Sequence, residues 1–216
     1  MAVTRVGNLE YVFRAGRSEL LVGIARLCVL YEDLRLELDA FRLVNEKPED
    51  DRSSDDQYRV MYFLRRALST VIEFRGGLTT VCKTPEFKSA ELTALDQRYI
   101  TEADQFLQGN WARLKELRNE FGGHVKLPGV QFAAEHFSDV FGSVTWNPAT
   151  TAWSVALECD FAGHIIAGAI SSRLTTGTDV RAELQAAIKI IGDGFVHAQA
   201  AMVALVHAFL WERFGR

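Results

Sequence analysis

The sequence predicts an all-α fold, a bundle of about five helices that carries a small β-hairpin. Apolar residues recur at helical spacing over several long segments, whereas a strand-like alternation is confined to one short stretch. The chain has 216 residues, of which 48% are hydrophobic, and this is enough to fill one core. We therefore expect a single domain over residues 1–216.

The first two helices are predicted over Ser18–Val44 and Asp56–Cys82. In the first, large apolar residues step by four and three, which is typical of helices that pack along a seam: Leu20, Ile24, Leu27, Tyr31, Leu34, Leu38 and Phe41. The second has two apolar stripes, one of them interrupted by Arg75, and should lie between neighbours. The acidic segment 45–57 between them has a net charge equal to the −4 of the whole chain, so we expect a solvated linker there.

A third helix is predicted over Ser89–Phe121. Its core face is expected to comprise Leu92, Leu95, Tyr99, Ala103, Phe106, Trp111, Leu114, Leu117 and Phe121. Residues 126–139 are less regular. The pattern then alternates over 143–157, with Val144 and Trp146 before the turn residues Asn147 and Pro148, and this predicts a β-hairpin insertion that packs on the bundle.

Two further helices are predicted over Phe161–Leu174, which is rich in small residues, and Asp179–Phe214, with a bend at Gly192 and Gly194. The second contains 18 residues without a charge, the lower limit for a membrane span. Its many alanines and its residues His197, Gln199 and His207 favour a buried central helix over a span. We see no signal peptide, and three cysteines without a CxxC pair indicate reduced thiols, so a cytoplasmic protein is expected.

Several kinds of chemistry have no support in the sequence. It contains no HExxH, no pair of ExxH motifs, no P-loop and no GxSxG. His197 and His207 share one helix without a neighbouring carboxylate and are interpreted as core histidines. We therefore expect no metal and no cofactor. A pI of 5.8 argues against a general nucleic-acid coat protein but allows a local basic site.

The segment RNEFGGHV, residues 118–125, closes the third predicted helix. On a helical wheel Arg118 falls about 40° from Leu114, inside the apolar stripe, so it should have an internal partner or lie in a crevice or interface. Gly122 and Gly123 weaken the helix and suggest a kink or an end before His124. Basic residues slightly outnumber acidic ones between residues 113 and 126.

Arg118, Asn119 and His124 together resemble the R-N-x4-H signature of HEPN domains, which are helical bundles of toxin, antiviral and RNA-processing systems. The resemblance implies metal-independent cleavage of RNA. His124 would move protons, Arg118 would stabilise the charge at phosphorus, and Asn119 would position the phosphate or either side chain. It also implies a homodimer whose two motifs face one cleft, and an antitoxin or a nucleotidyltransferase as a partner.

Two alternatives to an endoribonuclease stay open. The chain is a non-catalytic interaction or regulatory protein with a HEPN-like fold, or it is an unrelated helical bundle. In the unrelated bundle Arg118 pairs with a buried acid or carbonyl, and His124 caps a helix end.

Overall fold

The computed structural model describes residues 18–48, 51–119, 131, 135, 144–146, 157–159 and 180–211. Most of these residues are helical, so the predicted all-α class is confirmed. The chain divides into two compact units. Unit 1 comprises Met1–Leu36, Thr70–Leu114 and Ile190–Arg216, and unit 2 comprises Glu37–Ser69 and Lys115–Lys189. The prediction of one domain over 1–216 stays a prediction.

The first two predicted helices are confirmed. Helix α2 spans Glu19–Asn45 and α3 spans Ser54–Lys83, each within two residues of the expected bounds. The predicted seam of α2 forms core in unit 1, where Ile24, Leu27 and Leu34 have no exposed surface. Periodic burial of large aliphatic side chains therefore defines these helices, as the spacing indicated.

The prediction of one third helix over 89–121 is wrong, because the chain forms α5 (Ala94–Gly109) and α6 (Trp111–Leu117) there. Asn110 separates them as the C-cap of α5, since its backbone leaves the helical conformation at φ −94° and ψ 5°. Its side-chain Nδ2 also donates to Phe106 O. A short helix α4 (Pro85–Lys88) precedes them, capped by Thr84. The expected core position of Leu95 is also wrong, because Leu95 is 52% exposed and the next residue, Asp96, is buried instead.

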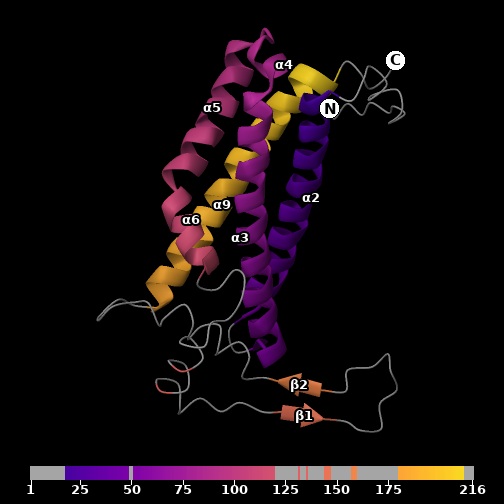
Figure 1. The fold of residues 1–216 in the computed structure, drawn as a ribbon. Coiled ribbons are helices and arrows are strands. Elements are labelled where there is room, and N and C mark those ends of the chain that lie inside the picture. The colour runs from indigo at the N-terminus through magenta and orange to yellow at the C-terminus, as the bar shows by residue number, and fades with distance from the viewer. Residues whose placement is uncertain are drawn as a thin grey trace. The chain divides into compact units, whose positions relative to one another are not determined.

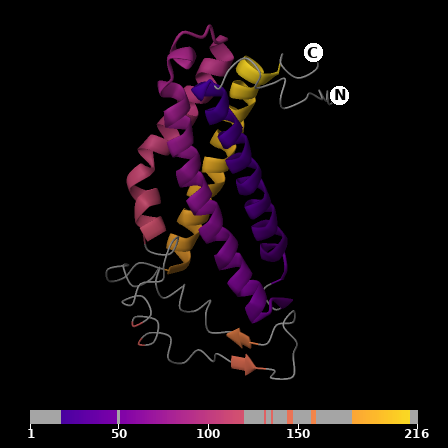
Figure 2. The ribbon, with the colours of Figure 1, turned by 45° about the vertical axis from the view of Figure 1, so that its right-hand side comes forward.

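The last helix, α9 (Val180–Leu205), continues into a π-helical turn, η3 (Val206–Leu210). Helix α9 continues without a break through Gly192 and Gly194, so neither glycine ends it, and the bend stays a prediction. Gly194 instead allows close packing, because a β-carbon there would lie 3.3 Å from Val71 Cγ1. In unit 1, α9 contacts α2 through Tyr31 and Phe195 and contacts α5 through Phe106 and His197. Figures 1 and 2 show α2, α3, α5 and α9 side by side.

Helices α2 and α3 approach closely at two glycines of unit 1. A β-carbon at Gly23 would lie 2.7 Å from Val81 Cγ2, and one at Gly77 would lie 2.8 Å from Leu27 Cδ2. Because real β-carbons do not come this close to other atoms, a larger residue at either position would force the neighbouring side chain to shift.

One helix among the described residues, Gln185–Leu210, is long and apolar enough to cross a membrane, with a mean hydropathy of 1.3. Only 39% of that window is buried. The core helix of a soluble protein can have the same length and composition. This finding alone therefore does not distinguish a core helix from a membrane-spanning one.

Two short strands lie in unit 2. Strand β1 (Val144–Trp146) pairs antiparallel with β2 (Leu157–Cys159), and Trp146 is opposite Leu157. Residues 147–156 separate the two strands. Of the second strand predicted from Trp153, Val155 and Leu157, only Leu157 lies within the described residues. The hairpin predicted over 143–157 is therefore not shown in that form. The helix predicted over Phe161–Leu174 lies outside the described residues.

Most described residues of the acidic segment 45–57 are exposed, as expected of a solvated linker, but the end of the segment is structured. Ser54–Gln57 form the first turn of α3, and Asp56 is only 6% exposed. Ser53 and Asp56 form a capping box, since Ser53 N donates to Asp56 Oδ2 at 3.1 Å and Asp56 N donates to Ser53 Oγ at 3.1 Å. The net charge of the segment did not predict this helix start.

Candidate functional site

Arg118 and Asn119 lie directly after α6, in a π-type turn of unit 2. Leu114 and Leu117 anchor the helix, with 0% and 2% of their surfaces exposed. Both Arg118 and Asn119 are exposed, so the expectation that Arg118 lies on a buried face is wrong. The reason is that α6 ends at Leu117, and a wheel drawn from Leu114 no longer sets the direction of the next side chain.

The two side chains are available to a ligand. Among the described residues, neither Arg118 nor Asn119 forms a hydrogen bond or an ion pair. Arg113, Lys115 and Glu116, by contrast, each have an interaction partner. An exposed guanidinium without an internal partner can donate two parallel hydrogen bonds to a phosphate. Gly122, Gly123 and His124 lie outside the described residues, so the distance between His124 and Arg118 stays untested.

Arg75, which interrupts an apolar stripe of α3, has a structural contact in unit 1. Its guanidinium carbon lies 3.9 Å from the centre of the Trp111 ring, and its Nη2 donates to Gln108 Oε1. The Nε atom is buried without a hydrogen-bond partner among the described residues. This stacking fixes the first residue of α6 against α3, so Arg75 positions the helix that precedes Arg118.

The structure adds a pair that the sequence interpretation missed. His207 Nδ1 lies 3.0 Å from Asp96 Oδ2, and Thr93 Oγ1 donates to the same oxygen at 2.7 Å. Burial raises the pKa of Asp96, but the hydrogen bonds from Thr93 and His207 outweigh it, so that pKa is lowered overall. His207 is 59% exposed at its side chain. The sequence does indicate the position of Asp96. Thr93-x-x-Asp96 is a helix-start pattern, and it places a carboxylate at the end of a helix.

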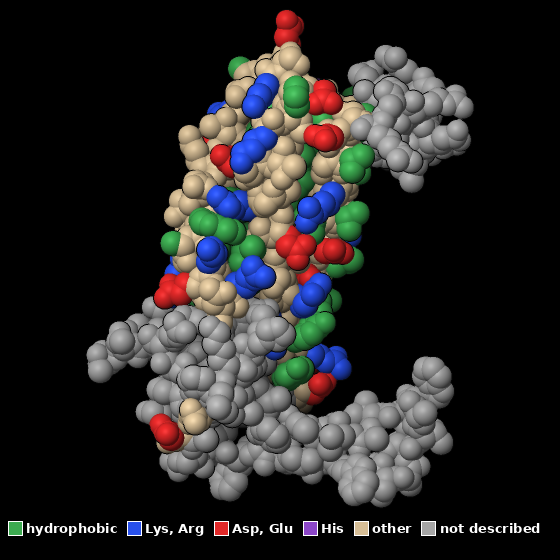
Figure 3. Space-filling model, in the orientation of Figure 1, with side chains coloured by type: hydrophobic (Ala, Val, Ile, Leu, Met, Phe, Trp, Pro, Cys, Tyr) green, Lys and Arg blue, Asp and Glu red, His purple; other side chains and the backbone are tan. Residues whose placement is uncertain are grey.

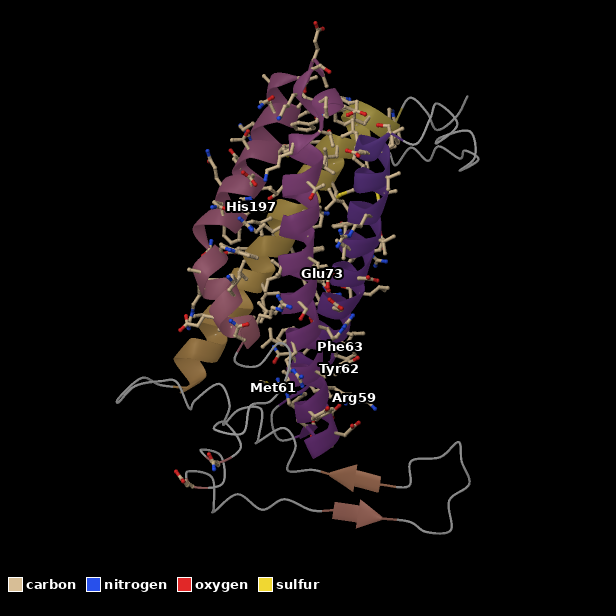
Figure 4. All side chains as sticks on the ribbon, viewed as in Figure 1. Arg59, Met61, Tyr62, Phe63, Glu73 and His197 are labelled. Carbon is tan, nitrogen blue, oxygen red and sulfur yellow. The ribbon has the colours of Figure 1, made fainter. Side chains whose placement is uncertain are left out.

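The other histidine of α9, His197, stacks on Phe106 with ring centres 4.5 Å apart. Figure 4 shows it between α5 and α9. This contact agrees with the interpretation of His197 as a core histidine. The interpretation is wrong for His207, because its carboxylate partner comes from α5, which the sequence of α9 alone cannot show.

Unit 2 contains a pocket of about 630 Å³ between the end of α2 and the start of α3. Its walls are mainly aliphatic and aromatic, and Figure 4 shows Arg59, Tyr62 and Phe63 along α3. The lining residues are Ala40, Leu43, Val44, Lys47, Asp55, Asp56, Tyr58, Arg59, Tyr62 and Phe63. A volume of this size is typical of small-ligand and peptide sites.

The charged groups of this pocket neutralise one another. Lys47 Nζ lies 2.7 Å from Asp56 Oδ1, and Arg59 Nε lies 2.8 Å from Asp55 Oδ2. The hydrogen bond from Lys47, together with those from Ser53, lowers the pKa of Asp56 to about 2. Because both cations already have carboxylate partners, the pocket suits an apolar or aromatic group better than a free phosphate.

Cys28 and Cys82 are free thiols, as expected, and both are half-buried. Burial raises the pKa of Cys28 and raises that of Cys82 to about 11. Such thiols are poor nucleophiles at neutral pH. Among the described residues there is also no group of three side chains that could bind a metal ion.

No family model, curated protein or solved structure matches this chain. The resemblance to HEPN domains therefore depends on Arg118, Asn119, His124 and the helical architecture alone.

Proposed function

We propose that the protein is a metal-independent endoribonuclease of HEPN type, acting as a toxin or defence component in the cytoplasm. The observation that supports it best is the exposure of Arg118 and Asn119 at the end of a bundle helix, without partners among the described residues. In the alternative of an unrelated bundle, Arg118 was expected to pair with a buried acid or carbonyl, and no such pair occurs among the described residues.

The proposed reaction is a transesterification within the RNA strand. The 2′-hydroxyl loses its proton to His124 and attacks the adjacent phosphorus, so the bond from phosphorus to O2′ forms and the bond to O5′ breaks. The 5′-oxygen leaves with the proton that His124 has taken up, so the histidine returns to its starting state. Arg118 stabilises the negative charge that accumulates on the phosphoryl oxygens, and Asn119 positions the phosphate. Products are a 2′,3′-cyclic phosphate and a 5′-hydroxyl, and no cofactor takes part.

The finer features of the prediction belong to the same proposal. The motifs of two subunits would face one cleft in a homodimer, and an antitoxin or a nucleotidyltransferase would control the activity. The hairpin over 143–157 would be an appendage of the bundle, and the chemistry does not depend on it.

The test is cleavage of varied RNAs in EDTA by wild type, Arg118→Ala and His124→Ala, with analysis of the product ends. We expect cyclic phosphate ends and a loss of at least about a hundredfold in each variant. Arg98→Ala and His207→Ala are the controls, since both residues are exposed and lie outside the motif. Cleavage by His124→Ala at the wild-type rate would refute the assignment.

The second candidate is a non-catalytic interaction module with the same fold. The apolar pocket of unit 2 favours it, because Leu43, Tyr58 and Tyr62 are 66%, 36% and 44% exposed there and could receive a peptide side chain. A folded wild-type protein that cleaves no RNA would favour this module over the ribonuclease.

A further inference from the structure

Unit 1 exposes an apolar face along two of its helices. Five large aliphatic side chains on this face are more than half exposed, although most aliphatic residues of α2 and α9 are buried. Their spacing is seven residues on each helix, so each set forms a straight line: Val22 (55%), Val29 (61%) and Leu36 (57%) on α2, and Val196 (60%) and Val203 (57%) on α9. Figure 3 shows hydrophobic side chains along α2 among charged ones.

The two lines border one groove. A groove of about 310 Å³ between α2 and α9 is lined by Cys28, Tyr31, Glu32, Gln199, Met202, Val203 and Val206. Val203 belongs both to the groove and to the exposed line of α9. Glu32 lies one helical turn from Val29 and Leu36, so the line of α2 runs beside the opposite wall. The face therefore has two apolar ridges with a groove between them.

We propose that this face binds a second copy of the chain, with a two-fold axis that passes beside Val29 at right angles to α2. The axis runs α2 antiparallel to α2 of the partner subunit. Val29 then meets its own copy, and Val22 meets Leu36 of the partner subunit. A surface that pairs with itself in this way needs no second kind of protein.

The charges beside the α2 line support this arrangement. Arg26 and Asp33 lie on the same flank of the line, three residues before and four residues after Val29. At about 1.5 Å per residue, they are about 4.5 Å and 6 Å from the axis on opposite sides. Arg26 Nη2 lies 4.0 Å from Glu73 Oε2 of its own chain, and this pair is weak because both side chains are exposed. In the dimer Arg26 therefore also meets Asp33 of the partner subunit, and symmetry forms the pair twice. Ala25 and Glu32 meet across the other flank without a charge conflict.

Helix α9 supports the same axis independently. Tyr31 stacks on Phe195, and Cys28 lines the groove with Gln199 and Met202. Val29 is therefore level with the part of α9 that lies between Val196 and Val203. The axis that passes beside Val29 consequently brings this part of α9 near its copy, so the apolar ridge of α9 also lies at the interface.

Other registers are less favourable. A shift of half a repeat would place Asp33 opposite Asp33 of the partner subunit and Glu32 opposite Glu32 of the partner subunit. Like charges directly opposed across an interface are destabilising. The charges thus select the register centred on Val29. This inference names a surface for the homodimer of the proposed function, but it uses residues of unit 1 alone, and its tests do not depend on ribonuclease activity.

The first test is a charge-swap cycle measured by sedimentation equilibrium. We expect the wild type to dimerise, Arg26→Glu and Asp33→Arg each to weaken the dimer about tenfold, and the double variant R26E/D33R to recover most of that loss. Arg98→Glu is the matched control, because Arg98 and Arg26 both have 62% side-chain exposure. A monomeric wild type at about 100 µM, well above the dissociation constant of a stable dimer, would overturn the proposal. So would a double variant weaker than both single ones.

The second test examines the axis by disulfide formation in a Cys28→Ser background. Val29→Cys should form a covalent dimer on mild oxidation, because the two copies meet at the axis. Val22→Cys and Leu36→Cys should each stay uncrosslinked alone and should crosslink when the two proteins are mixed. Equal crosslinking of all three single variants, or none in the mixture, would refute this register.

Discussion

Two neighbouring glycines of α3 offer a matched test of the packing between α2 and α3. Gly76 and Gly77 lie in the same helix, so alanine has the same intrinsic helical preference at both positions, about 1 kcal/mol over glycine. Their surroundings differ. A β-carbon at Gly76 would have nothing within 4 Å, whereas one at Gly77 would lie 2.8 Å from Leu27 Cδ2.

The expected magnitudes follow from these surroundings. Gly76→Ala should raise the free energy of unfolding by up to about 1 kcal/mol. Gly77→Ala has the same gain in helical preference, but its β-carbon would press on Leu27. Leu27 has no exposed surface and cannot move away freely. Overpacking of a buried contact typically costs about 1–3 kcal/mol, so the two variants should differ by about this amount.

Urea unfolding followed by circular dichroism measures the difference, with wild type as the reference. In a chain of this size, each kcal/mol also shifts the melting temperature by about 2–4 °C. If Gly77→Ala were as stable as Gly76→Ala, the close approach of α2 and α3 in unit 1 would be wrong. A loss of stability in Gly76→Ala would contradict the open surroundings of that residue.

Three further outcomes are expected. The lowered pKa of Asp96 means that its stabilising contribution is present above the ordinary carboxyl pKa, about 3.9, and is lost as the pH falls below it. Wild type should therefore lose more stability than Asp96→Asn between pH 7 and pH 3, and equal losses would contradict the pair with His207. Cys82, with its pKa raised to about 11 from 9.0, should react with iodoacetamide at pH 8 about a hundredfold more slowly in the folded chain than after unfolding. Peptide mapping checks this, and similar rates would refute it. Arg75→Lys keeps the charge but loses the flat stack on Trp111, so it should cost about 1 kcal/mol in urea unfolding, and no change would contradict the stack.

Helical periodicity predicted the long elements correctly, because burial of one face is a local property of the sequence. The seam through Ile24, Leu27 and Leu34 is the clearest case, and it is fully buried. Periodicity did not predict the end of a helix where that end depends on a single capping residue. Asn110 divides the third predicted helix, although apolar residues continue on both sides of it.

The candidate site was predicted only in part. Arg118 and Asn119 follow the end of a helix, as predicted, whereas His124 lies outside the described residues. The exposure of Arg118 could not be derived, since it depends on where α6 stops. The contact between His207 and Asp96 was not predicted either, because 111 residues separate them and only the packing of α5 on α9 brings them together. Long-range pairs of this kind have no local signature.

The division of the chain has a consequence for its synthesis. Unit 1 is assembled from three separate stretches, and the last begins at Ile190, after all of unit 2 has been made. Ile191, Ala198 and Leu205 of that stretch are buried in the described core. On the ribosome, the apolar faces of the earlier helices therefore stay uncovered while residues 115–189 are translated. This takes on the order of 4–15 s at about 5–20 residues per second. During that interval the nascent chain presents hydrophobic surface to chaperones, and slower translation of residues 115–189 would prolong the exposure.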